Sequence, residues 1–189
     1  MKITEDKVIH GKDLHSFLKT SMQYEYCTFK NCDFTANNLS GFSFLECEFQ
    51  DCDLSRIELI GCSFKQVVFK GSKLMGLRFD QCNSLLLEMR FEECILDYSS
   101  FYQLKISGTS FENCSCKNCD FTEANMEATN LSGTDLSGAT FDQTNLQKAI
   151  FHHATSLLID PEKNKLRGAQ FNTGHLPGLL QKYGIAITE

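Results

Sequence analysis

Large apolar residues recur at every fifth position along most of the chain. From Phe29 the step reaches Phe or Leu each time as far as Phe79, and after a slip of two residues it resumes at Phe91 and runs to Phe151. Five residues turn a helix by about 140° and carry a flat strand to its opposite face, so neither element gathers this spacing on one side. A backbone that turns a corner every five residues does bring these residues to one side, the inside of the coil. The pattern therefore predicts five-residue segments coiled around an apolar interior.

The positions two residues before each large one provide a test, because alternate side chains of a strand point the same way. From Cys27 to Ala149 these positions hold Cys, Ser, Thr, Asn, Ala or a larger apolar residue, and never a charged one. Matching residues also recur twenty apart, as in Phe101, Phe121 and Phe141. Twenty residues per turn give four segments. We therefore predict an all-β, quadrilateral β-helix whose coils rise by about 4.8 Å.

The chain divides around this repeat. We expect an N-terminal cap, a first run of coils, a register break, a second run of coils and a C-terminal cap that also serves dimerisation, at residues 1–23, 24–79, 80–90, 91–155 and 156–189. Pro177–Tyr183 has the pattern of a short helix, with proline near its start and Gly184 as its stop. Ile185–Ile187 predicts a further strand.

The chain has ten cysteines, and the fragment Cys114–Cys119, with three of them, looks like part of a metal site. In the five-residue register, however, these side chains point into different segments of the coil and do not converge on one ion. We interpret them as packed core thiols. No nucleophile motif, zinc-binding helix or phosphate-binding glycine loop is found in the sequence. We expect no catalytic residue, no metal, no cofactor and no enzyme activity.

The charges lie almost entirely at outward positions. The net charge of -6 argues against direct binding of nucleic acid, and we expect no membrane contact because no apolar run is long enough to cross a bilayer. No secretory signal opens the sequence, so we expect a cytoplasmic protein. The second run of coils is rich in carboxylates, and we predict that eight of them form a partner-binding surface: Glu92, Asp97, Glu112, Asp120, Glu123, Glu127, Asp135 and Asp142.

The segment Ala124–Phe141 repeats a small residue, a polar residue, a large apolar residue and two polar residues. This motif resembles the pentapeptide-repeat family. The ending, from Leu157 to Ile187, is similar to that of the quinolone-resistance (Qnr) proteins and the microcin B immunity protein. The resemblance implies a right-handed β-helix and a two-fold dimer, and we assign the dimer interface to Leu176, Leu179, Leu180, Tyr183, Ile185 and Ile187. A cap within a single chain is the alternative for this ending.

The resemblance also implies a function. Relatives of this kind mimic duplex DNA, so that carboxylates replace phosphates on DNA gyrase or topoisomerase IV and protect against a quinolone or a toxin. The sequence leaves a second hypothesis open, in which the coil is an interaction scaffold for an unrelated protein partner.

Overall fold

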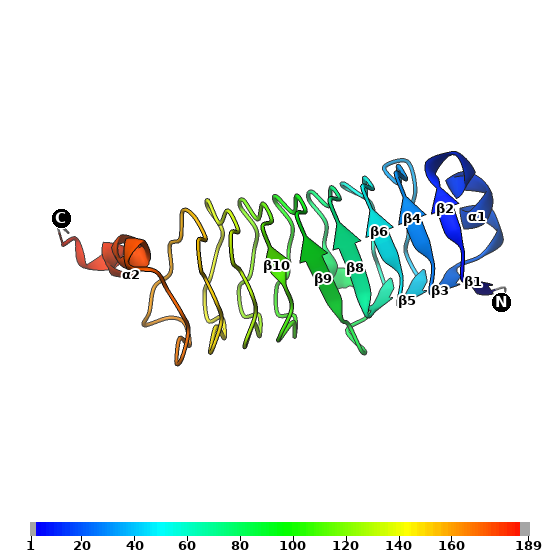
Figure 1. Ribbon diagram of the computed structural model, residues 1–189. Coiled ribbons are helices and arrows are strands. Elements are labelled where there is room, and N and C mark those ends of the chain that lie inside the picture. Colours follow the sequence, from blue (N-terminus) through cyan, green and yellow to red (C-terminus); the bar gives the residue numbers. More distant parts are fainter. Residues whose placement is uncertain (1–2, 186–189) are drawn as a thin grey trace.

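The computed structural model describes residues 3–185, which form a rod of stacked coils (Figure 1). Helix α1 (Leu14–Thr20) covers one end and helix α2 (Leu176–Leu180) lies at the other. Short strands run across the coils between them: β1 (Ile3–Glu5), β2 (Val8–His10), β3 (Gln23–Glu25), β4 (Thr28–Lys30), β5 (Ser43–Leu45), β6 (Glu48–Gln50), β7 (Ser63–Lys65), β8 (Val67–Lys70), β9 (Met89–Glu92) and β10 (Phe111–Glu112). No helix within the described range is long and apolar enough to span a membrane.

All strand pairs are parallel and follow the predicted period. Phe29 pairs with Phe49 and Phe49 with Phe69, so each coil there contains twenty residues. The strands form a four-stranded sheet, β1-β3-β5-β7, and a six-stranded sheet, β10-β9-β8-β6-β4-β2. Beyond β10 single bridges keep the same spacing, the last joining Ile150 to Gln170. The structure thus confirms a pentapeptide-type β-helix with parallel strands.

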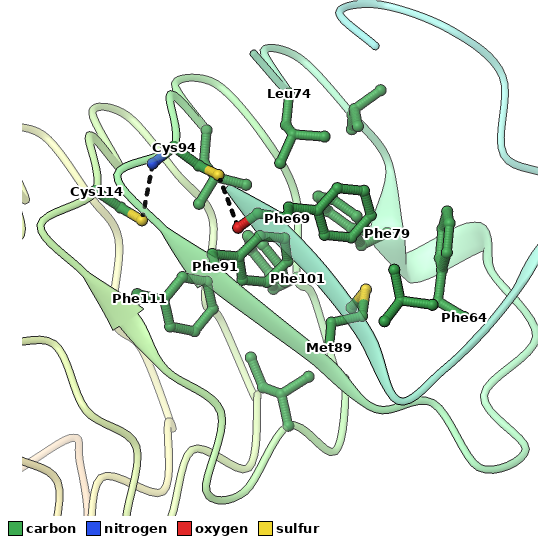
Figure 2. Packing of buried hydrophobic residues seen from close by; sticks show 14 of the residues in the cluster. Phe64, Phe69, Leu74, Phe79, Met89, Phe91, Cys94, Phe101, Phe111 and Cys114 are labelled. Carbon is green, nitrogen blue, oxygen red and sulfur yellow. Dashed lines mark hydrogen bonds between the residues drawn. The ribbon is translucent and has the colours of Figure 1, made fainter. Parts of the chain in front are cut away.

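The large apolar residue of each segment lies inside the rod, as predicted. The phenylalanine rings stack from coil to coil; Phe101, Phe121 and Phe141 have centroids 5.2 Å apart at each step. Figure 2 shows the same arrangement around Phe91, where rings of neighbouring segments also meet edge to face. Stacked and edge-to-face pairs add stabilisation beyond the burial of apolar area.

The residues two positions earlier also face inward, with Asn37 and Ala139 partly exposed. Inward hydroxyl groups donate to carbonyl oxygens of the preceding coil, as Thr134 does to Phe111 (2.6 Å) and Ser99 to Leu74 (2.7 Å). A buried hydroxyl without such a partner would destabilise the fold. The small polar residues at these positions are therefore compatible with the core.

All ten cysteines are buried and free, which confirms their interpretation as core thiols. The Cys94 thiol contacts the Phe69 carbonyl oxygen at 3.3 Å, and the Cys94 backbone N–H donates to the Cys114 sulfur at 3.4 Å (Figure 2). Burial raises the pKa of the Cys47 and Cys82 thiols to about 12. Thiols held protonated in this way are poor metal ligands and poor nucleophiles.

The N-terminal residues contain a helix that the five-residue pattern did not indicate. Strands β1 and β2 already pair twenty residues ahead with β3 and β4, and α1 then closes this end of the rod. Leu14 is buried, and Phe17 and Leu18 pack against the core. Phe17 and Leu18 follow Leu14 by three and four residues, which is the spacing of apolar residues on one face of a helix.

The register break consists of one coil with twenty-two residues, since Val67 pairs with Met89. Its extra length lies in residues 83–88, which project from the rod below β8 and β9 in Figure 1. Leu85 and Leu86 are 66% and 68% exposed, while Leu87 is partly buried against the core. The break is therefore a projecting loop with two solvent-exposed leucines.

The C-terminal end contains the predicted short helix. Helix α2 is followed by a single 3₁₀ turn, η4 (Gln181–Tyr183), and by Gly184 with a left-handed φ of 61° that ends the helix. A Cβ atom on Gly178 would overlap the carbonyl oxygen of Leu157, so α2 packs directly on the preceding chain. Most of the strand expected at Ile185–Ile187 lies outside the described residues.

Candidate partner-binding surface

The eight predicted carboxylates stand at outward positions of the coil, but they do not share one side of it. The register assigns Glu92 and Glu112 to the side of Phe111, Asp97 and Asp135 to that of Cys116, and Glu127 to that of Met126. Asp120, Glu123 and Asp142 lie together on the side of Phe121. The carboxylates therefore surround the rod, and the densest group is on the Phe121 side.

Glu92 and Glu112 are register partners in β9 and β10, so their side chains stack one coil apart. The Lys70 ammonium group lies 3.7 Å from the Glu92 carboxylate but only 3.0 Å from that of Glu48. Glu112 has no salt bridge among the described residues. A directly opposed like-charge pair destabilises a sheet. Folding stability therefore does not explain why Glu92 and Glu112 are stacked on each other.

Asp97 and Asp135 instead have structural contacts. The Ser115 hydroxyl and the Lys117 backbone N–H both donate to Asp97, at 2.6 and 3.0 Å. The Lys117 ammonium group lies 3.3 Å from Asp135. A hydrogen bond from the Ser137 hydroxyl, with a smaller contribution from Lys117, lowers the pKa of Asp135 although partial burial opposes this. Both carboxylates therefore hold structural contacts within the coil, and Lys117 partly neutralises Asp135.

Glu127 and Asp142 have lysine partners as well. The Lys148 ammonium group lies 2.7 Å from Glu127, and that of Lys163 lies 3.9 Å from Asp142. Exposed pairs of this kind stabilise a fold by about 1 kcal/mol or less. They do, however, reduce the negative potential around these two positions.

The Phe121 side also holds residues that the sequence analysis did not single out. An open cleft of about 450 Å³ is lined by Arg78, Ser100, Tyr102 and Asp120. Arg78 forms a two-bond ion pair with Asp80, at 2.9 and 2.7 Å, and Gln103 donates to Glu123 at 2.8 Å. An aromatic residue at an outward position of the repeat is the signal in the sequence that could have drawn attention to Tyr102.

Burial of Asp80 opposes its ionisation, but hydrogen bonds from Arg78 and Ser100 and the charge of Arg78 outweigh this and lower the pKa of Asp80. Asp120 accepts a hydrogen bond from the Thr122 backbone N–H at 2.9 Å and has no salt bridge among the described residues. Asp80, and to a smaller extent the charge of Asp120, raises the pKa of Arg78, so Arg78 partly compensates Asp120 as well. Glu123 has no salt bridge among the described residues and is the less compensated carboxylate on this side of the rod.

The predicted dimer residues lie around α2. Leu176, Tyr183 and Ile185 are 45%, 53% and 55% exposed. Leu179 packs partly against the core, and Leu180 is half-buried. Ile187 lies outside the described residues.

Three contacts attach this segment to the loop before it. Lys182 bridges Asp160 and Glu162 at 2.7 and 2.6 Å, and the Tyr183 hydroxyl donates to Glu162 at 2.9 Å. The exposed apolar side chains are thus presented on an anchored helix.

No group of three or more His, Cys, Asp or Glu side chains in residues 3–185 is arranged to hold a metal ion.

The family model described as "Pentapeptide repeat region" matches residues 22–101, 43–121 and 72–151. These matches overlap and together cover more than half of the chain. The chain therefore belongs to the pentapeptide-repeat family. No curated protein matches it in sequence.

Among solved structures, the chain is similar to a trypsin-treated variant of QnrB1, a plasmid-mediated fluoroquinolone resistance protein, with 18% identity, a TM-score of 0.65 and coverage of 98% of this chain and 97% of that one. A second trypsin-treated variant of QnrB1 matches with 18% identity, a TM-score of 0.54 and 99% coverage of both chains. HetL from Nostoc sp. strain PCC 7120, involved in heterocyst differentiation regulation, has 15% identity, a TM-score of 0.37 and coverage of 84% and 91%. The two QnrB1 likenesses establish a shared fold.

Proposed function

We propose that this protein is a non-enzymatic mimic of duplex DNA that binds DNA gyrase or topoisomerase IV and confers resistance to a quinolone or a toxin. The observation that carries the proposal is the stacking of Glu92 on Glu112, a destabilising like-charge pair on the outer surface of the rod. Glu123, which has no salt bridge among the described residues, and Asp120, which shares Arg78 with Asp80, extend the carboxylate surface to a second side. A cytoplasmic location follows from the proposed target.

A right-handed, four-sided rod suits such mimicry. Its coils repeat at about 4.8 Å, so a stack of carboxylates presents regularly spaced negative charge to a basic DNA-binding surface. Electrostatic complementarity of this kind speeds association and selects the partner. The likeness in fold to QnrB1 along nearly the whole chain supports the choice of target.

The test is a supercoiling reaction with purified gyrase. We expect the wild-type protein to inhibit or protect the enzyme, with an effect that weakens as salt rises because exposed charges are screened over about 10 Å at 0.1 M. The combined substitutions Glu92→Gln, Glu112→Gln, Asp120→Asn and Glu123→Gln should reduce the effect at least about tenfold, since outward charges contribute mainly to association. Asp97 and Asp135 are left unchanged because they hold structural contacts.

The matched control removes the same number of negative charges from another part of the rod. Glu5, Asp6, Glu46 and Asp51 lie on the first coils, are exposed, are not stacked on one another and have no salt bridge among the described residues. Their replacement by Gln or Asn should leave the gyrase effect nearly intact. Equal losses in both variants would mean that only net charge matters, and no response of gyrase to micromolar wild-type protein at low salt would refute the DNA-mimic proposal.

The second candidate function is an interaction scaffold for an unrelated protein. The observation in its favour is that the carboxylates surround the rod and that Asp97, Asp135, Glu127 and Asp142 have structural or cationic partners of their own. Under this alternative, gyrase would not respond, while the fold and the C-terminal assembly would be unchanged.

We further propose that the chain forms a homodimer through α2 and the residues that follow it. Gly178→Ala should weaken the dimer about tenfold or more, because the added methyl group would displace α2 from Leu157. Light scattering across a dilution series measures this. Gly174→Ala is the control, since a Cβ there meets no atom within 4 Å. A monomeric wild-type chain would contradict the dimer and favour a cap within one chain.

A further inference from the structure

Tyr102 presents an aromatic ring on the outer surface of the Phe121 side. Its side chain is 38% exposed and lines the cleft of about 450 Å³ together with Arg78, Ser100 and Asp120. The fold does not require a ring at this outward position, because Phe101 already fills the interior of the same segment. Tyrosine is enriched at protein interfaces, where its apolar ring and polar hydroxyl group both find contacts. The exposed ring therefore marks a contact site.

Two carboxylates lie beside this ring. The Tyr102 hydroxyl group is 3.5 Å from the Glu123 carboxylate, which also accepts a hydrogen bond from the Gln103 amide at 2.8 Å. Asp120 lines the cleft with Tyr102. A cation placed against the ring would be attracted both by the face of the ring and by these carboxylates.

The C-terminal end of the chain contains the same combination of groups with its cation in place. The Tyr183 hydroxyl group donates to Glu162 at 2.9 Å, and the Lys182 ammonium group lies 5.0 Å from the centroid of the Tyr183 ring. The same ammonium group bridges Glu162 and Asp160, at 2.6 and 2.7 Å. A tyrosine next to two carboxylates is thus completed, within this chain, by a cationic side chain.

No cation of the chain takes this place at Tyr102. In residues 3–185 the cation–π contact is that of Lys182 with Tyr183. Arg78, in the same cleft, is held by Asp80 through two hydrogen bonds of 2.9 and 2.7 Å. On the segments of this side between residues 57 and 143, one arginine opposes five carboxylates, Glu58, Asp80, Asp120, Glu123 and Asp142. The side therefore favours a positively charged partner.

The partner group that fits this cleft best is a guanidinium. A guanidinium is planar, so it can lie flat on an aromatic ring while the N–H groups at its edge donate to carboxylates. Glu123 and Asp120 belong to different positions of the segment, and a group with five N–H donors can address both, whereas an ammonium group is a compact point charge.

We propose that the Tyr102 cleft binds an arginine side chain on the basic surface of the partner protein. This assignment rests on the proposed function, in which the rod faces a basic DNA-binding surface. It adds the side of the rod that makes the contact and the residue type that is recognised.

The probe is the capped tripeptide acetyl-Gly-Arg-Gly-amide, titrated into the full-length protein at constant, low ionic strength while the tyrosine ring resonances are followed by NMR. We expect a saturable shift of Tyr102 at millimolar peptide. Tyr98 is the internal control, because it is 65% exposed on the same coil but stacks between Gly76 and Asn118. The same peptide with citrulline, which is the neutral analogue of arginine, should bind at least about tenfold more weakly.

Three results of this titration would overturn the proposal. Equal binding of the arginine and citrulline peptides would show that charge is not recognised. No saturable shift at Tyr102 would show that the cleft does not bind the side chain. Equal shifts at Tyr98 and Tyr102 would show only general attraction of cations to an acidic protein.

Two substitutions of Tyr102 separate the ring from its hydroxyl group in the gyrase reaction. Tyr102→Leu removes the ring and should weaken the gyrase effect about fivefold, whereas Tyr102→Phe keeps the ring and should stay within about twofold of the wild type. Tyr98→Leu is the matched control and should behave as the wild type. All three melting midpoints should stay within about 2 °C of the wild type, because these side chains lie on the surface. Equal losses in Tyr102→Leu and either of the other variants would contradict stacking on the Tyr102 ring.

The two experiments together distinguish this site from the proposed function. If Tyr102 binds the arginine peptide in preference to the citrulline peptide while gyrase does not respond to the wild-type protein, the DNA mimicry is refuted and arginine recognition is supported. If gyrase responds equally to the wild type and to Tyr102→Leu, the arginine site is overturned and the DNA mimicry stands.

Discussion

Phe121→Asp is expected to prevent folding. Phe121 is completely buried, stacks on Phe101 and Phe141 at 5.2 Å and meets Phe111 edge to face at 5.8 Å. Loss of a buried aromatic ring costs about 3–5 kcal/mol by itself. An unpaired carboxylate in its place adds several kcal/mol more, against a total stability of about 5–15 kcal/mol. Circular dichroism should show no cooperative thermal transition.

The control for this substitution places the same charge outside the rod. Asn118 lies three residues earlier, is exposed and has the left-handed conformation of a corner residue, with φ of 54°. Asn118→Asp changes neither shape nor backbone preference and adds a charge beside Lys117, so its melting midpoint should match that of the wild type. Similar behaviour of the two variants would contradict the inward and outward assignment of the five-residue register.

Asn164→Leu is expected to lower the free energy of unfolding by about 3 kcal/mol, because it leaves buried backbone groups without partners. Asn164 is only 8% exposed. Its amide donates to the carbonyl oxygens of Phe141 and Asp160, both at 3.0 Å, and its side-chain oxygen accepts from the Thr144 N–H at 2.9 Å. It thereby joins the last coils to the loop that precedes α2.

Thermal unfolding followed by circular dichroism measures the effect, with a fall of the midpoint by about 10 °C for a chain of this size. Amide hydrogen exchange at Thr144 should accelerate in the variant, since its acceptor is removed. Asn145→Leu is the control, because the Asn145 amide bonds to Asn125 on the outer surface, where water can replace it. An unchanged midpoint for Asn164→Leu would show that water enters this end of the rod.

Much of the fold could be predicted from the sequence because one physical requirement repeats in every segment. A large apolar residue and a small one must face inward at fixed spacing, and charged residues cannot take those positions. The buried stack of Phe101, Phe121 and Phe141 and the buried cysteines follow directly. The short C-terminal helix was predictable for a different reason, since proline and glycine mark its two ends.

Other features depend on contacts that the period does not encode. Helix α1 follows a helical spacing of Leu14, Phe17 and Leu18 that is too short to stand out beside the dominant repeat. Asn164 stands twenty residues after the inward Thr144, but the period does not specify that its amide meets the three backbone groups that make a buried Asn compatible with the core. The projection of residues 83–88, with Leu85 and Leu86 exposed, also depends on the path of the chain in space, because the two-residue slip indicates extra length but not its direction.

Some features of the candidate site could likewise be predicted from the sequence, and others could not. The sequence by itself determined that the carboxylates point outward and that Glu92 stacks on Glu112, because both facts depend only on the five- and twenty-residue periods. Only the tertiary structure decided which carboxylates remain unneutralised. Long side chains reach across coils, so Lys117 meets Asp135 and Lys148 meets Glu127, while Glu112 has no salt bridge among the described residues. Such contacts depend on side-chain reach and rotamer, which no periodicity of residue types specifies.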